Sequence, residues 1–214
     1  MTAVRDDSAL RLMLISDVAG RDPADVAARI DLICKRAQPG SVIVQLRDKE
    51  LSARARIEFG KALAQAAHGA GQWFIVNERV DIAVLLAADG VHLPEESISP
   101  REVHSLFATS AKRIPWISTA WHDIERKPPS DANAYVVSPI VQERKGRPAL
   151  GLSALKQARA QLEPTQRLFA LGGIDAHTAG ACLEHGADAV AVIGAAFDAD
   201  PIPLLRALGI ERSP

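Results

Sequence analysis

Short, mainly apolar runs alternate with helix-like segments along almost the whole sequence, and the number of these pairs limits the fold more than any other feature. Eight such runs are bounded by Gly, Pro, Asn, Asp or Ser, as buried strands are. They cover residues 10–16, 42–49, 73–76, 90–93, 115–118, 134–137, 168–171 and 189–193. Eight strands, each followed by a helix, close a (β/α)8 barrel, so we predict an α/β protein of the TIM-barrel class.

Helix-like segments follow the runs, and some carry start signals. Asp22-Pro23 places a capping carboxylate before a proline at the first helical position. Helices are predicted over residues 24–36, 52–68, 80–87, 153–162, 175–184 and 203–208, and one opens at 99–102. Pro128 and Pro129 restrict any helix after the fifth run to residues 121–126. A doubly wound open sheet would show the same alternation, and the count of eight favours the barrel.

The composition is typical of an ordinary globular protein without a strong overall charge. The 214 residues suit one TIM-barrel domain over residues 1–214. The net charge of -1, from 25 basic and 26 acidic residues, argues against nucleic-acid or membrane partners. Cys34 and Cys182 make neither a disulfide framework nor a metal cluster. We see no signal peptide and no apolar stretch of ~20 residues, so we expect a cytoplasmic protein; a homo-oligomer stays open.

Polar residues follow several of the predicted strands, where barrel enzymes place their active sites. Gln45, Arg47 and Lys49 alternate at the end of the second strand and would point to one side, towards an anion. The alternative is a solvated strand end. The other polar candidates on this rim include Asn77, Glu78, Arg79, Asp89, His92, His122 and Ser138. Glu78, Asp89 and Glu96 are candidate ligands of a divalent cation. His92 and His122 are candidate bases, with a purely structural role as the alternative.

Glycines after the seventh and eighth strands predict a phosphate site. Gly172-Gly173 and Ile193-Gly194 would let backbone N–H groups approach an anion. The alternative for Gly172-Gly173 is a tight turn without a ligand. Arg47 and Lys49 lie across the barrel from these glycines, which indicates a second anionic group. The loop of residues 142–147 adds three cations, Arg144, Lys145 and Arg147. They could stabilise a leaving diphosphate, or they are simply solvated surface charges.

Four segments resemble the thiamine phosphate synthase and thiazole tautomerase (TMP-TENI) family. Residues 45–49 resemble its Q-x-R-x-K strand end, and residues 76–83 resemble its V-N-D-R-x-D-x-A. Residues 88–93 are similar to its A-D-G-V-H-L, and residues 170–174 to its A-x-G-G-I. Four segments in the correct order and spacing are more specific than any single motif, and the resemblance covers almost the whole chain.

The resemblance implies a TIM barrel that joins hydroxymethylpyrimidine diphosphate to thiazole phosphate with Mg²⁺, giving thiamine phosphate and pyrophosphate. Arg47, Lys49 and Asn77 would hold the diphosphate, Gln45 the pyrimidine, and Gly173 with its neighbours the thiazole phosphate. We therefore expect small phosphorylated pyrimidine and thiazole substrates. The candidate catalytic residues are Arg47, Lys49 and His122. The candidate substrate-binding residues are Gln45, Asn77, His92, Ser138, Lys145, Gly172, Gly173, Ile193 and Gly194.

Some residues depart from the family pattern. The two metal aspartates of the family fall at Glu78 and at Ser97, which has no carboxylate, so the implied Mg²⁺ site is weakened. Met13 replaces a tyrosine, Ala120 replaces a serine, and residues 138–145 lack the family's threonines. Two alternatives therefore stay open. One is a tautomerase-like isomerase that uses His122 or a carboxylate as acid and base. The other is a noncatalytic phosphate-ligand-binding paralogue.

Overall fold

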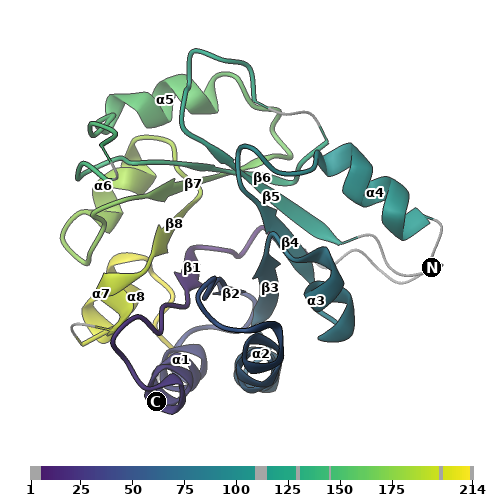
Figure 1. Ribbon diagram of the computed structural model, residues 1–214. Helices are drawn as coiled ribbons and strands as arrows, with labels where there is room; N and C mark the ends of the chain where they lie inside the picture. Colours follow the sequence, from purple (N-terminus) through teal and green to yellow (C-terminus); the bar gives the residue numbers. More distant parts are fainter. Residues whose placement is uncertain (1–5, 109–114, 129–130, 145, 198–199, 213–214) are drawn as a thin grey trace.

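The strands form one closed parallel barrel in sequence order, with β8 beside β1. The computed structural model describes residues 6–108, 115–128, 131–144, 146–197 and 200–212 (Figure 1). The strands are β1 (Leu12–Ile15), β2 (Val42–Leu46), β3 (Trp73–Asn77), β4 (Gly90–Leu93), β5 (Trp116–Trp121), β6 (Ala134–Val137), β7 (Arg167–Leu171) and β8 (Ala189–Val192). The predicted (β/α)8 TIM barrel is confirmed.

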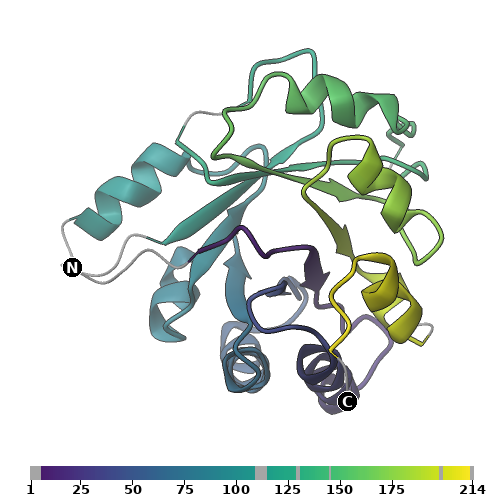
Figure 2. The ribbon, with the colours of Figure 1, turned by 180° about the vertical axis from the view of Figure 1, so that it is seen from behind.

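Helices surround the strands, as the front and back views show (Figures 1 and 2). They are α1 (Pro23–Arg36), α2 (Ala53–Gly69), α3 (Val80–Leu85), α4 (Pro100–Ala108), α5 (Ser153–Arg159), α6 (Ala179–Glu184), α7 (Gly194–Phe197) and α8 (Ile202–Ala207). Asp22 caps α1 as predicted, because its Oδ1 accepts a hydrogen bond of 2.7 Å from the backbone N–H of Ala24. Among the described residues, no helix is long and apolar enough to cross a membrane.

The connection from β5 to β6 differs from the prediction. β5 runs on to Trp121, and the described residues between the two strands form turns instead of a helix. The Trp121 indole N–H donates to the carbonyl oxygens of Asp123 and Arg126, at 2.8 and 3.1 Å. These local hydrogen bonds stabilise turns in the segment to which the prolines were expected to restrict any helix.

Two helix starts after the later strands also differ. α6 begins at Ala179 and not at Asp175. The Asp175 carboxylate accepts from the backbone N–H groups of His177 and Thr178, at 2.9 and 3.0 Å, as a capping residue does, and residues 176–178 form a turn that leads into the helix. The short α7 directly after β8 was not predicted. Four residues are too few to show a helical period in the sequence.

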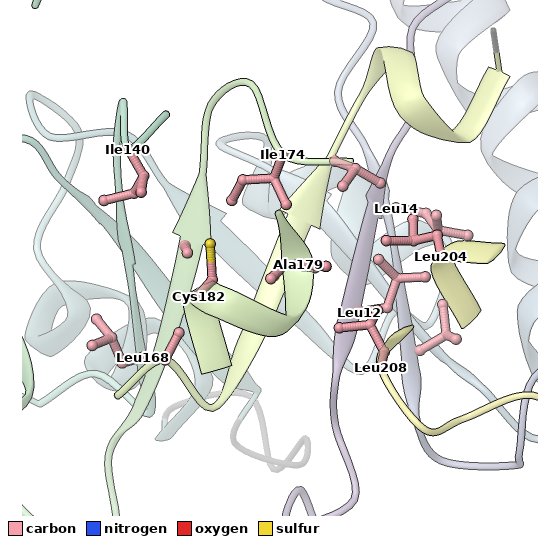
Figure 3. Close-up of a cluster of buried hydrophobic side chains, with 14 of the residues drawn as sticks. Leu12, Leu14, Ile140, Leu168, Ile174, Ala179, Cys182, Leu204 and Leu208 are labelled. Atoms are coloured by element: carbon pink, nitrogen blue, oxygen red, sulfur yellow. The ribbon is translucent and has the colours of Figure 1, made fainter. Parts of the chain in front are cut away.

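Alternating side chains divide the core between the barrel interior and the helix layer. Met13, Ile43, Trp73, Val136 and Phe169 fill the interior. The residues between them on each strand pack outwards against the helices. Figure 3 shows part of this outer core, with Leu12, Leu14, Ile140, Leu168, Ile174, Ala179, Cys182, Leu204 and Leu208. The filled interior leaves the polar inward positions near the carboxyl ends of the strands as the open part of the barrel.

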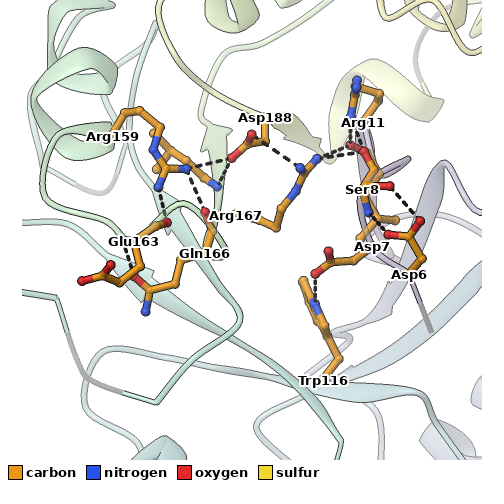
Figure 4. Close-up of polar contacts among 12 residues, drawn as sticks. Asp6, Asp7, Ser8, Arg11, Trp116, Arg159, Glu163, Gln166, Arg167 and Asp188 are labelled. Atoms are coloured by element: carbon orange, nitrogen blue, oxygen red, sulfur yellow. Dashed lines mark hydrogen bonds and ion pairs between the residues drawn. The ribbon is translucent and has the colours of Figure 1, made fainter. Parts of the chain in front are cut away.

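A polar network ties the N-terminal segment to the opposite, amino-terminal end of the barrel (Figure 4). Arg167 at the start of β7 donates to the Leu10 carbonyl at 3.1 Å and lies 3.6 Å from the carboxylate of Asp188. Asp188 also accepts from Arg159 at 3.1 Å, and the Trp116 indole donates to Asp7 at 2.9 Å. Charged residues at this end therefore join strands and the leading segment.

Candidate active site

Gln45 and Asn77 lie side by side inside the carboxyl-terminal end of the barrel. The flanking Val44 and Val76 pack outwards, so both amides point inwards. Their side chains are buried, and Gln45 Nε2 donates to Asn77 Oδ1 at 3.3 Å. Gln45 Oε1 and Asn77 Nδ2 are buried without a partner among the described residues. Flipping both amides would exchange the two roles, so one donor and one acceptor are left in either orientation.

Asp48 anchors the end of β2 between Arg47 and Lys49. Its carboxylate accepts hydrogen bonds from the Ser16 hydroxyl and, at 2.7 Å, from the backbone N–H of Val18. The Ser16 hydroxyl oxygen accepts in turn from the backbone N–H of Arg47 at 3.0 Å. Asp48 is only 4% exposed. The sequence interpretation did not single out Asp48, because an acidic residue between two basic ones has the pattern of an exposed charged segment.

Lys49 and Glu78 connect the loops that follow β2 and β3. Lys49 Nζ lies 2.7 Å from Glu78 Oε2, with both side chains nearly half exposed. Glu78 has a positive φ of 66°, and its backbone N–H donates to the His92 carbonyl at 2.8 Å. Arg79 points away from this pair and binds Asp81 through Nε at 2.8 Å. Of these three neighbouring residues, Lys49 and Glu78 therefore meet on the rim.

His92 occupies the centre of this polar arc. Its Nδ1 lies 2.9 Å from the hydroxyl oxygen of Ser118 on β5. Burial, above all, lowers the pKa of His92 to about 4, and the neighbouring side chains of His122, Lys49 and Arg47 lower it further. Arg47 and Lys49, the two cations that follow β2, therefore both act on the His92 ring. The sequence placed Ser118 on the rim as well, but gave it no role and did not predict its contact with His92.

His122 and Ser138 meet across the ends of β5 and β6. Nδ1 of His122 lies 2.9 Å from the Ser138 carbonyl oxygen and 3.1 Å from its hydroxyl oxygen. A carbonyl can only accept, so Nδ1 carries a proton and donates to it. The half-buried His122 ring therefore has a fixed orientation on the rim.

Gly172-Gly173 forms a turn against the loop that follows β6. Gly172 and Gly173 have φ values of 108° and 72°. A Cβ on Gly172 would lie 2.9 Å from Pro139 Cα, and one on Gly173 would lie 2.5 Å from Gln142 Cβ. Close packing therefore requires these glycines whether or not a ligand binds. The helix predicted over residues 175–184 is present but begins at Ala179, six residues after Gly173, whereas α7 begins at Gly194 next to Ile193.

The loop of residues 142–147 turns towards the loop that follows β4. Arg147 Nη2 lies 3.6 Å from Glu95 Oε2, and the backbones of Arg144 and Arg147 pair with each other. Lys145, a predicted substrate-binding residue, lies outside the described residues. The loop therefore joins the rim beside β5, between the ends of β4 and β6.

The candidate metal ligands do not come together. Asp89 precedes β4 and lies at the opposite end of the barrel from Glu78, where it accepts from the Phe74 backbone N–H at 2.9 Å. Its predicted role as a ligand is therefore wrong. Glu78 is paired with Lys49, and Ser97 supplies only a hydroxyl group. In the described part of the chain, no three His, Cys, Asp or Glu side chains are grouped to hold a metal ion.

A surface cleft of about 830 Å³ lies apart from these residues. Its lining includes Arg21, Asp25, Arg29 and Phe197, and none of the candidate site residues. The inward-facing polar arc is the stronger candidate because one buried atom of each amide, Gln45 Oε1 and Asn77 Nδ2, has no hydrogen-bond partner among the described residues, and such atoms are rare in folded proteins.

The fold and the rim define a class: a (β/α)8 barrel with cationic side chains near a buried amide pair that has one donor and one acceptor left unpaired. Residues 12–196 match the family described as thiamine monophosphate synthase (TMP-TENI), and the chain belongs to this family. The resemblance seen in the sequence is confirmed.

Named relatives agree over most of the chain. The thiamine-phosphate synthase of Roseiflexus castenholzii is 34% identical over 197 residues, covering 89% of this chain and 84% of the relative. That of Thermus thermophilus is 33% identical over 201 residues, covering 92% and 95%. A solved thiamine phosphate pyrophosphorylase from Pyrococcus furiosus has a TM-score of 0.76 at 23% identity and covers 95% of this chain and 97% of that one. This structural likeness shows the fold.

Proposed function

We propose that the protein is a thiamine phosphate synthase that joins hydroxymethylpyrimidine diphosphate to thiazole phosphate and releases pyrophosphate. Its family and its synthase relatives place it among the transferases. The observation that carries the proposal is the buried Gln45–Asn77 pair, which offers one unpaired donor and one unpaired acceptor beside Arg47 and Lys49. An aminopyrimidine presents the complementary groups, an exocyclic amine and ring nitrogens, and its diphosphate suits the two cations.

The chemistry needs charge stabilisation more than proton transfer. The bond between the pyrimidine methylene carbon and the diphosphate oxygen breaks, and both electrons leave on the oxygen. The thiazole nitrogen then uses its lone pair to form the new C–N bond. Arg47 and Lys49 would stabilise the leaving diphosphate, and the amide pair would hold the ring in line for attack. The thiazole phosphate would lie near Gly173 and Gly194, where backbone N–H groups can approach an anion.

A Mg²⁺ site made from two protein carboxylates does not fit these residues. Glu78 has its carboxylate paired with Lys49 at 2.7 Å, and Ser97 has none. Mg²⁺ commonly uses one or two carboxylates together with substrate phosphates. We therefore assign the diphosphate charge to Arg47 and Lys49, and expect pyrophosphate to bind to the protein in the presence of chelator.

The test is product formation from the two phosphorylated substrates, with and without Mg²⁺. Thiamine phosphate and pyrophosphate should appear in equal amounts. Arg47→Ala should lose about tenfold or more in pyrophosphate affinity, because a hydrogen-bonded charge pair is removed. Arg54→Ala, on the exposed surface of α2, is the matched control. A folded sample that makes no thiamine phosphate under either condition would contradict the proposal, and conversion of a thiazole isomer without the diphosphate would favour an isomerase.

A further inference from the structure

The Ser118 hydroxyl determines which nitrogen of His92 carries the proton. Ser118 is fully buried, and within the described residues its hydroxyl has one hydrogen-bond partner, Nδ1 of His92 at 2.9 Å. If Nδ1 were the donor, the hydroxyl proton would be buried without an acceptor, which is costly. The hydroxyl therefore donates to Nδ1. The proton of the neutral ring is then on Nε2.

The other nitrogen of His92 faces the open part of the barrel. Val91 and Leu93 pack outwards in the helix layer, so the side chain of His92 points inwards. Asn77, which carries an unpaired amide nitrogen, is its partner on β3. Nε2 has no hydrogen-bond partner among the described residues, and His92 keeps 9% of its surface exposed. The N–H group on Nε2 is thus available to a ligand.

The charges around His92 indicate what that ligand is. Arg47, Lys49 and His122 act on the ring, and Glu78, whose backbone contacts the His92 carbonyl, is paired with Lys49. Cations attract an anion to this point, and burial keeps the ring itself neutral, with its pKa lowered to about 4. A neutral N–H donor among cations suits a phosphoryl oxygen.

We propose that His92 donates a hydrogen bond from Nε2 to an oxygen of the bound diphosphate group, and that Ser118 is the positioning residue that holds this tautomer. The identity of the diphosphate rests on the proposed function. His92 then acts as a fixed donor to the departing oxygens and takes no proton in the reaction.

The first test is histidine ¹⁵N NMR on the whole protein at neutral pH. The spectrum should show His92 protonated at Nε2, and Ser118→Ala should shift the ring towards a mixture of tautomers, while Ser118→Thr keeps the hydroxyl and the tautomer. Inorganic pyrophosphate should then move the Nε2 resonance. A ring protonated at Nδ1, or a Nε2 resonance that pyrophosphate leaves unchanged, would overturn the proposal.

The second test compares two amides at position 92. The amide nitrogen of His92→Gln reaches the place of Nε2, whereas that of His92→Asn reaches only the place of Nδ1. We expect pyrophosphate affinity to fall about tenfold more in His92→Asn than in His92→Gln. Equal losses would contradict the donor role. If the tautomer and the pyrophosphate effects hold while no thiamine phosphate is made, the proposed function fails and the role of His92 stands.

Discussion

At the scale of single residues, Asp48 explains why the cations of β2 stand where they do. We expect Asp48→Asn to lower the free energy of unfolding by about 1–3 kcal/mol, because hydrogen bonds to a buried carboxylate are lost. The same change should weaken pyrophosphate binding, since Arg47 loses its anchored backbone. Urea unfolding and calorimetry check both effects. The control is Glu58→Gln, which removes the carboxylate of an exposed ion pair with Lys61. Equal losses of unfolding free energy and of pyrophosphate affinity in the two variants would refute the anchoring role of Asp48.

His92 provides a second prediction at this scale. Its folded pKa of about 4 lies below the ordinary value of 6.5, so the unfolded chain binds more protons between these pH values. Stability from this residue is complete above pH 6.5 and is lost as the pH falls towards 4. At pH 5 the loss should be about 2 kcal/mol. The free energy of unfolding, measured with urea, should therefore fall more between pH 7 and pH 5 for the wild type than for His92→Gln. Parallel pH profiles for the two proteins would contradict this assignment to His92.

The sequence placed polar residues at the ends of the strands but did not predict the contacts that hold them in position. The two-residue spacing of Gln45, Arg47 and Lys49 is readable because side chains alternate along a strand. Ser16 and Ser118 are ordinary polar residues in the sequence. They gain roles only when the fold brings them to Asp48 and His92, over 32 and 26 residues respectively. Sequence alone carries no signal for such contacts.

At the scale of secondary structure elements, buried parallel strands were predictable because they are apolar throughout. The connections were less predictable, because individual side-chain contacts within each loop decide them. The Trp121 indole closes the turn after β5, and Asp175 caps a turn that precedes α6. Asp89 was misplaced because it precedes β4, and a residue next to a short strand can belong to either end of the barrel.

The turn between β7 and α6 yields a prediction with an internal control. Gly173 and Gly151 both have positive φ, 72° and 78°, but a Cβ on Gly173 would clash with Gln142 at 2.5 Å, while one on Gly151 meets nothing within 4 Å. Alanine at either position carries the backbone strain, and only Gly173→Ala adds the clash. We expect Gly173→Ala to cost about 1–3 kcal/mol more. Urea unfolding of both variants measures this difference, and equal losses would show that the loop after β6 yields freely.

At the scale of the whole molecule, the two ends of the barrel separate stability from ligand binding. Arg167, at the amino end, ties the leading segment to β7 through the Leu10 carbonyl and lies near Asp188. In Arg167→Met, Asp188 keeps its contact with Arg159 and is not left unpaired. We expect the free energy of unfolding to fall by about 1–3 kcal/mol.

Pyrophosphate affinity should stay unchanged in Arg167→Met, because the cations that would hold it lie on the opposite rim. Arg47→Ala is the reciprocal variant: it should lose affinity and keep the unfolding free energy within about 0.5 kcal/mol, as surface substitutions do. Calorimetry and urea unfolding on the same two proteins test the separation. A parallel fall of affinity and stability in Arg167→Met would mean that the barrel transmits strain between its ends, because its packed interior of Trp73, Trp116 and Phe169 lies between them.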